Sequence, residues 1–236
     1  KIADFSNCEN ACATSDTYKL APLIKDATEN FEPKKQLKVI NTGTISKYFM
    51  RWGISKMTYL KQKYLHPVVN KEEFLSLFKN SYSKKSVQAK IIIKGLNLLD
   101  ACIDIDGDVI PGKSTLIIAN SNLKKLKLLL SILNSKLAFF YIKERYPASS
   151  YNKGTNFTKD MINNMPMPQM TENEQEPLIN LTDDILSLTT SAGYFENEEK
   201  QASVKNIEHQ IDLMVYELYG LTEEERQVIE ASVSKS

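Results

Sequence analysis

Residues 122–145 form the most apolar long stretch of the chain and constrain its fold more than any other segment. Two sets of apolar residues recur there at helical spacing: Leu126, Leu129, Leu130 and Leu133, then Leu137, Phe140 and Tyr141. This pattern predicts a helix with a wide buried face. Asn122 can cap its start, and Pro147 prevents its continuation. The stripe changes phase at Asn134-Ser135, which predicts a break there, and we expect strands to pack against this central helix.

The chain length of 236 residues is enough for one large domain or two small ones. The chain begins with Lys1 and its first residues do not resemble a signal peptide, so we expect a fragment of a longer protein. No apolar run approaches the ~18 residues that a membrane span needs. Cys8, Cys12 and Cys102 are predicted to be free thiols in a reducing cytoplasm, and with only two histidines in the chain a zinc site is not expected.

Charge is distributed unevenly along the sequence. Residues 1–170 carry 26 basic and 14 acidic side chains, a balance of +12, whereas residues 171–236 carry 4 and 15, a balance of −11. This asymmetry predicts that the first part faces a polyanion and that the last part does not. A solvated, lysine-rich surface is the alternative interpretation.

The segments around the central stretch alternate between strand and helix signals. Residues 1–14 read as a short strand or loop, 45–52 as an extended segment, and 59–69 as a segment with a further strand. Helices are expected over residues 17–26, 71–79 and 157–163, and strands over 37–40, 89–93, 98–104, 109–110 and 114–119. Asp106-Gly107 is a hairpin signal between two of these strands. We therefore expect an α/β (α+β) domain over residues 1–170, with a curved, largely antiparallel sheet packed on the central helix.

The sequence becomes acidic and helical from about Thr171. Two apolar stripes predict an antiparallel helical pair. The first stripe is Leu178, Leu181, Ile185 and Leu188, and the second is Val204, Ile207, Ile211, Met214 and Leu218. Thr222 and Glu225 have the spacing of a capping box that opens a last short helix. Residues 171–236 are thus predicted to be a helical spacer or packing region.

Catalytic patterns are missing from the sequence. It has no GxGxxG, Walker or HExxH motif, and two histidines supply catalytic triads poorly. The carboxylates of Asp100, Asp104, Asp106 and Asp108 do not have the spacing of a calcium loop. We therefore expect no catalytic residue, no metal site and no cofactor within this chain.

Basic, amide, hydroxyl and aromatic side chains instead suggest a binding surface. Such groups suit phosphate oxygens and base edges. The candidates for contact with DNA are Lys38, Asn41, Thr42, Thr44, Lys47, Tyr48, Arg51, Lys90, Lys94, Arg145, Tyr151, Lys153, Asn156 and Lys159. Among them, Lys38, Lys47 and Lys153 are predicted to contact phosphates. Those predicted to lie nearest base edges are Asn41, Thr44, Arg51 and Asn156.

Several segments resemble, in order, the target-recognition domain of type IIG restriction-modification enzymes. The segment Lys38-Val-Ile-Asn-Thr-Gly-Thr-Ile-Ser-Lys-Tyr48 with Trp52-Gly53 looks like its opening segment, and Leu130-Ser-Ile-Leu-Asn-Ser-Lys-Leu137 is similar to its central helix. The stretch from Tyr151 through Met165-Pro-Met-Pro168 resembles its closing segment. The stretch from Ile211 through Tyr219-Gly-Leu-Thr to Glu225 resembles the usual end of the full enzymes.

The resemblance implies that the chain reads a short sequence in double-stranded DNA and positions an upstream N6-adenine methyltransferase, with or without a nuclease. S-adenosylmethionine would belong to that methyltransferase, whose Asn-Pro-Pro-Tyr motif is absent here. Its partners would be DNA and the methyltransferase domain or a separate modification subunit, without a membrane. Two alternatives stay open: half of a type I restriction specificity subunit, and a protein-interaction module that does not bind DNA.

Overall fold

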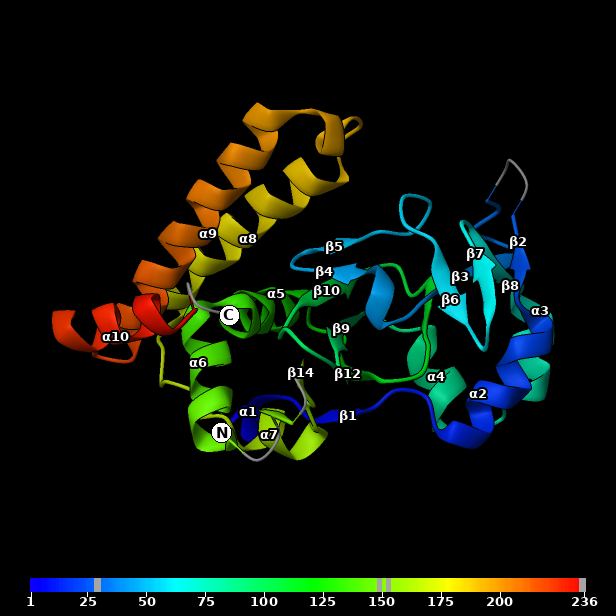
Figure 1. The fold of residues 1–236 in the computed structure, drawn as a ribbon, viewed down its shortest axis with the longest axis horizontal. Helices are drawn as coiled ribbons and strands as arrows, with labels where there is room; N and C mark the ends of the chain where they lie inside the picture. The colour runs from blue at the N-terminus through cyan, green and yellow to red at the C-terminus, as the bar shows by residue number, and fades with distance from the viewer. Residues whose placement is uncertain (28–30, 148–149, 152–153, 234–236) are drawn as a thin grey trace.

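The computed structural model describes residues 1–27, 31–147, 150–151 and 154–233. Two four-stranded sheets form its centre (Figure 1). Sheet A has the order β1 (Cys8–Asn10), β12 (Thr115–Ala119), β9 (Lys90–Lys94), β10 (Ala101–Asp104). Sheet B has the order β11 (Val109–Pro111), β3 (Gln36–Ile40), β8 (Pro67–Asn70), β2 (Lys25–Asp26). Within them only β11 and β3 pair in parallel. The expected fold class is confirmed, although the strands divide between two sheets.

Three two-stranded ribbons and a set of helices complete the fold. The ribbons are β4 (Ile45–Ser46) with β5 (Phe49–Met50), β6 (Met57–Tyr59) with β7 (Gln62–Tyr64), and β13 (Ser150–Tyr151) with β14 (Gly154–Thr155). The helices before the central pair are α1 (Ile2–Phe5), α2 (Thr14–Leu20), η1 (Ala21–Leu23), η2 (Thr42–Thr44), α3 (Lys71–Leu77) and α4 (Ser81–Ser86). The central pair and those after it are α5 (Leu123–Asn134), α6 (Lys136–Arg145), α7 (Lys159–Asn164), α8 (Glu172–Thr190), η4 (Tyr194–Glu196), α9 (Glu198–Leu218) and α10 (Glu223–Val233).

The layers follow from which face of each strand is apolar. In β9, Ile91 and Ile93 share a core with the leucines of α5, whereas Ile92 joins a second core with Ile40 and Val109 of sheet B. A strand buried on both faces needs such a continuous apolar run. The far face of sheet B packs on α2, α3 and α4 in a third core. Sheet A therefore lies between α5 and sheet B.

The central helix breaks where the sequence predicts. Ser135 is extended (φ −69°, ψ 154°), and its hydroxyl caps α6 by accepting from the amide of Ala138. The buried Asn134 side chain accepts from the amide of Ala101 at 2.8 Å and donates to its carbonyl at 3.0 Å. Asn134 thus satisfies the amide of Ala101 on β10, an edge strand of sheet A, whereas the Ala101 carbonyl also accepts from the amide of Tyr48 at 2.8 Å. The break thus lets an amide side chain close the sheet edge.

Two local predictions are wrong. The Asp106-Gly107 turn does not form a hairpin, because β11 leaves sheet A and pairs with β3 in sheet B. The helix expected over residues 17–26 ends at Leu20; η1 has Pro22 in its first turn, and the chain then pairs as β2 with the edge of β8. The Asp26 carboxylate fixes that strand by accepting from the amides of Leu65 and His66.

The predicted helical pair is present and packs on the central helices. The 19-residue α8 lies against α5, and ion pairs join Lys124 to Glu176 and Lys127 to Asp183. The capping box of Thr222 and Glu225 opens α10 as expected. The division of the chain at residue 170 stays a prediction, because one apolar core includes residues from both sides of it.

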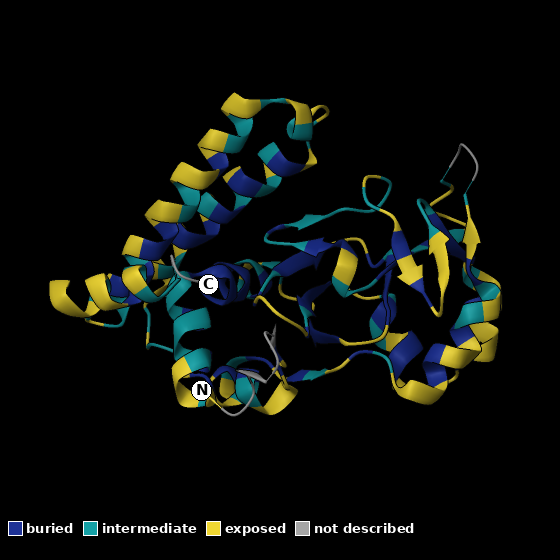
Figure 2. Cartoon of the chain, in the orientation of Figure 1, coloured by how far each residue is buried: buried dark blue, intermediate teal, exposed yellow. Residues whose placement is uncertain are grey.

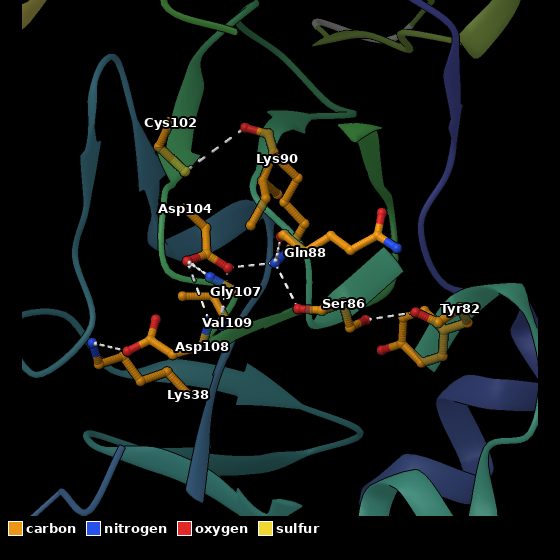
Figure 3. A network of polar contacts seen from close by, with 11 residues as sticks. Lys38, Tyr82, Ser86, Gln88, Lys90, Cys102, Asp104, Gly107, Asp108 and Val109 are labelled. Atoms are coloured by element: carbon orange, nitrogen blue, oxygen red, sulfur yellow. Dashed lines mark hydrogen bonds and ion pairs between the residues drawn. The ribbon is translucent and has the colours of Figure 1, made fainter. Parts of the chain in front are cut away.

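A buried ion pair lies within sheet A, at the point where the chain passes to sheet B (Figure 3). Lys90 in β9 contacts the Asp104 carboxylate, and both side chains are almost fully shielded, at 0% and 2% exposure. Asp104 also accepts from the amides of Gly107 and Val109, at 3.0 and 3.1 Å. Gly107 has φ +69°, and a Cβ there would lie 2.5 Å from the carbonyl oxygen of Val87, so the turn requires glycine.

The substitution Asp104→Asn should lower the free energy of unfolding by about 3–5 kcal/mol, because it leaves the buried Lys90 ammonium without a counter-charge. The matched control is Asp108→Asn, which removes the partly exposed Lys38–Asp108 pair and should cost about 1 kcal/mol or less. Urea denaturation measures both. Equal losses would show that the fold does not depend on the buried pair.

Candidate nucleic-acid interface

Six of the sequence-predicted contact residues are used inside the fold. Lys90 is completely buried in the Asp104 pair, so it cannot contact DNA. Thr44 and Tyr48 are also buried, at 1% and 3% exposure. Lys38 binds Asp108 at 3.0 Å, and Lys94 lies 3.4 Å from Asp100. Burial contradicts the predicted DNA contacts of Lys90, Thr44 and Tyr48, whereas those of the partly exposed Lys38 and Lys94 stay predictions.

Asn41 is the sixth, and both the oxygen and the nitrogen of its side-chain amide form hydrogen bonds within the fold. Its Oδ1 accepts from the amide of Gly43 at 3.0 Å, and its Nδ2 donates to the carbonyl of Thr58 at 2.8 Å. That it reads a base edge stays a prediction. Asn41 caps η2 and ties that turn to β6, so it positions the β6–β7 hairpin.

Two further candidates contact the helical pair. The Arg51 guanidinium lies 5.4 Å from the ring centre of Phe195 in η4. Its Nε is buried and has no hydrogen-bond partner among the described residues. Burial raises the pKa of Glu208 and of Asp212 in α9, and the nearby Lys47 ammonium partly opposes both shifts. Both cations are thus partly neutralised or covered by the acidic helices.

Three of the remaining candidates are exposed. Arg145 at the end of α6 and Lys159 at the start of α7 are exposed. Asn156 is exposed beside a hollow of about 610 Å³ that also borders β1 and α4. The cation of that hollow, Lys85, is paired with Glu9. Tyr151 is described only in its backbone, in β13, and Lys153 lies outside the described residues.

The structure brings together a basic surface that the sequence did not single out. Residues 33–71 contain nine Lys or Arg and no Asp or Glu. Within them the β6–β7 hairpin exposes Thr58 and all four residues 60–63, as the yellow strands in Figure 2 show. Lys56 precedes the hairpin, and both Lys61 and Lys63 lie on it. These exposed lysines suit a polyanion.

A small hollow of about 160 Å³ lies beside this hairpin. Its lining comes from Thr17 of α2 and from three further segments: Asn41 and Thr42 at η2, residues 58–60 of the hairpin, and Lys113 with Ser114 between β11 and β12. Lys113 and Ser114 are exposed, and Ser114 has a left-handed backbone with φ 61°. We name the exposed residues of this hairpin, together with Thr42, Lys113 and Ser114, the hairpin surface. An ammonium and two hydroxyl groups meet there, which is the donor set that phosphate contacts use.

Sequence reasoning overlooked the hairpin because its turn carries no glycine or asparagine. Leu60 and Lys61 form the two-residue turn with φ 43° and 76°. Hairpin turns of this kind usually contain Asn-Gly, which is the signal that sequence analysis uses. The useful sequence signal was the long segment without acidic residues.

Among the described residues, no group of three or more His, Cys, Asp or Glu side chains could hold a metal ion. Cys8, Cys12 and Cys102 are free thiols. Of the helices in the described residues, none is both long and apolar enough to span a membrane.

The Glu208 carboxyl should make the stability of the protein depend on pH. Burial raises its pKa above the ordinary value of 4.5, while Lys47 partly opposes the shift. Because the folded protein holds this proton more tightly than the unfolded chain, the free energy of unfolding should decrease as pH rises from about 4.5 through the folded-state pKa. Glu208→Gln should remove that part of the pH dependence and stabilise the protein at neutral pH. Urea unfolding across pH 4–8 measures it, and an unchanged slope in the Glu208→Gln variant would contradict a raised pKa for this carboxyl.

Comparison with known proteins supports the fold independently. No protein-family model matches the sequence, and no curated protein matches it. Solved structures do match. One is that of the type IIG restriction endonuclease BpuSI, with a TM-score of 0.51 and 12% identity over 92% of this chain. Another is the type IIL restriction-modification enzyme MmeI in complex with DNA, with a TM-score of 0.51 and 10% identity over 96% of this chain. The chain spans 31% and 36% of those two proteins, and it shares the fold of that part of them.

Proposed function

We propose that this chain is the DNA target-recognition part of a longer restriction-modification enzyme. Almost the whole chain shares its fold with a part of two such enzymes, one of them solved in complex with DNA. The observation that carries the proposal to this chain is the hairpin surface, where exposed lysines lie within a segment free of acidic residues. That surface suits the phosphates of duplex DNA.

The proposed division of labour assigns recognition to this chain and chemistry to the rest of the enzyme. An N6-adenine methyltransferase using S-adenosylmethionine, and in some forms a nuclease, would lie outside residues 1–236. The chain would act in the cytoplasm, where it reaches chromosomal and invading DNA. Its own residues bind and orient the duplex, and we assign no reacting group among them.

Binding to a random pool of duplexes across salt concentrations tests the proposal, with the bound molecules sequenced. We expect a short enriched motif and an affinity that decreases steeply with salt, with a slope of about −0.9 per neutralised phosphate. Absence of binding at low salt by the folded chain would contradict the proposal. Salt-sensitive binding without an enriched motif would contradict sequence reading by this chain on its own.

The double substitution Lys61→Gln and Lys63→Gln should reduce the magnitude of the salt slope by about 1–2 and weaken binding similarly on every sequence. The matched control is Lys205→Gln, which removes an exposed lysine from α9. It should leave the slope unchanged. If the control weakens binding as much as the hairpin variant does, the hairpin surface is not the binding face.

A further inference from the structure

We propose that the tip of the β6–β7 hairpin, Leu60-Lys61, is a wedge that enters a groove of duplex DNA and presses Leu60 against a base step. This inference rests on the proposed function and deepens it by assigning the element that contacts the bases. Four observations on the hairpin carry it: its backbone, the chemistry of its tip, the rigidity of its base and the hollow beside it.

The backbone of the tip is in a conformation that side chains disfavour. Leu60 and Lys61 both lie in the left-handed region, with φ 43° and 76°. Glycine or asparagine would occupy these positions with less strain, and hairpins with a two-residue turn usually have them. Strain held at an exposed tip is typical of functional positions. The chain places a leucine and a lysine where a stability-optimised turn would have neither.

The chemistry of the tip fits an apolar wedge within a cationic rim. The Leu60 side chain is 40% exposed, and Lys61 and Lys63 beside it are exposed. A single exposed leucine is ordinary on a protein surface. At the tip of a hairpin with two lysines it matches proteins that insert leucine between base steps while basic side chains hold the adjacent phosphates.

The base of the hairpin is fixed, so the tip is presented rigidly. The Tyr59 hydroxyl donates to the carbonyl of Thr17 in α2 at 3.2 Å, and Met57 is completely buried. On the other side, the Asn41 amide donates to the carbonyl of Thr58. Two anchors from different parts of the fold therefore hold the strands before DNA arrives. Preorganisation of this kind reduces the entropy that binding loses.

The hollow beside the tip gives the DNA backbone a place to lie. Leu60 forms part of its wall, and Thr42, Lys113 and Ser114 line it from neighbouring loops. A duplex with the tip in its groove would present phosphates on both sides of that groove. The hydroxyl and ammonium groups of the hollow are suited to one of those strands.

The test uses the duplex most enriched from the random pool, labelled at its ends with a fluorescent donor and acceptor. A wedge unstacks bases and bends DNA by about 20–90°, so wild-type protein should increase energy transfer between the ends. Leu60→Ala should weaken binding by about tenfold and abolish the change in energy transfer. The control Leu77→Ala removes a leucine that is 50% exposed on α3, and it should behave as wild type.

A second variant separates the wedge from simple misfolding. Leu60→Asn with Lys61→Gly supplies the residues that the turn prefers, so this protein should melt at a higher temperature than wild type. It should nevertheless bind DNA more weakly than Leu60→Ala. If wild-type protein binds the duplex and both hairpin variants bind it as tightly as wild type, the wedge is wrong and DNA recognition stands. If wild-type protein binds no duplex, the proposed function fails and the wedge fails with it.

Discussion

The buried Asp104 carboxylate, paired with Lys90 inside sheet A, is the group on which the junction between the two sheets depends. Burial lowers the pKa of Lys90 and raises that of Asp104, and in each case the opposite charge of the partner counteracts the shift. Asp104 ends β10 in sheet A, and its carboxylate accepts from the amide of Val109, where β11 of sheet B begins. Because β11 pairs with β3, this junction also sets the start of η2 and, through Asn41, the hairpin surface.

The acidic helical pair has a structural role that its charge alone does not suggest. Its connection, η4, packs Phe195 on Phe49 of β5 with ring centres 4.7 Å apart. Glu208 and Asp212 of α9 face Lys47, which precedes Tyr48 in the turn between β4 and β5. These two carboxylates of α9 therefore hold an internal turn. A polyanion would be steered towards the hairpin surface and away from the helices.

Prediction from sequence succeeded where local chemistry decides the structure. Asn134-Ser135 broke the central helix, and Thr222 with Glu225 opened the last one, because capping depends on neighbouring residues. It failed where the partner is distant in the sequence. Lys38 and Asp108 are 70 positions apart, so no local pattern could show that the lysine is neutralised. The parallel pairing of β11 with β3 is equally non-local. Of the candidate lysines that form ion pairs, Lys90 is buried, whereas Lys38 and Lys94 remain partly exposed.

The most direct test of the central claim is amide hydrogen exchange of the chain with and without a bound duplex. The claim is that DNA lies on the hairpin surface, on the side formed by η2 and the β6–β7 hairpin. We predict slower exchange in the complex at residues 42–44, 57–64 and 113–115, with no change along α9. Protection confined to α8 and α9, with the hairpin unaffected, would contradict this account and move the binding face to the helical pair.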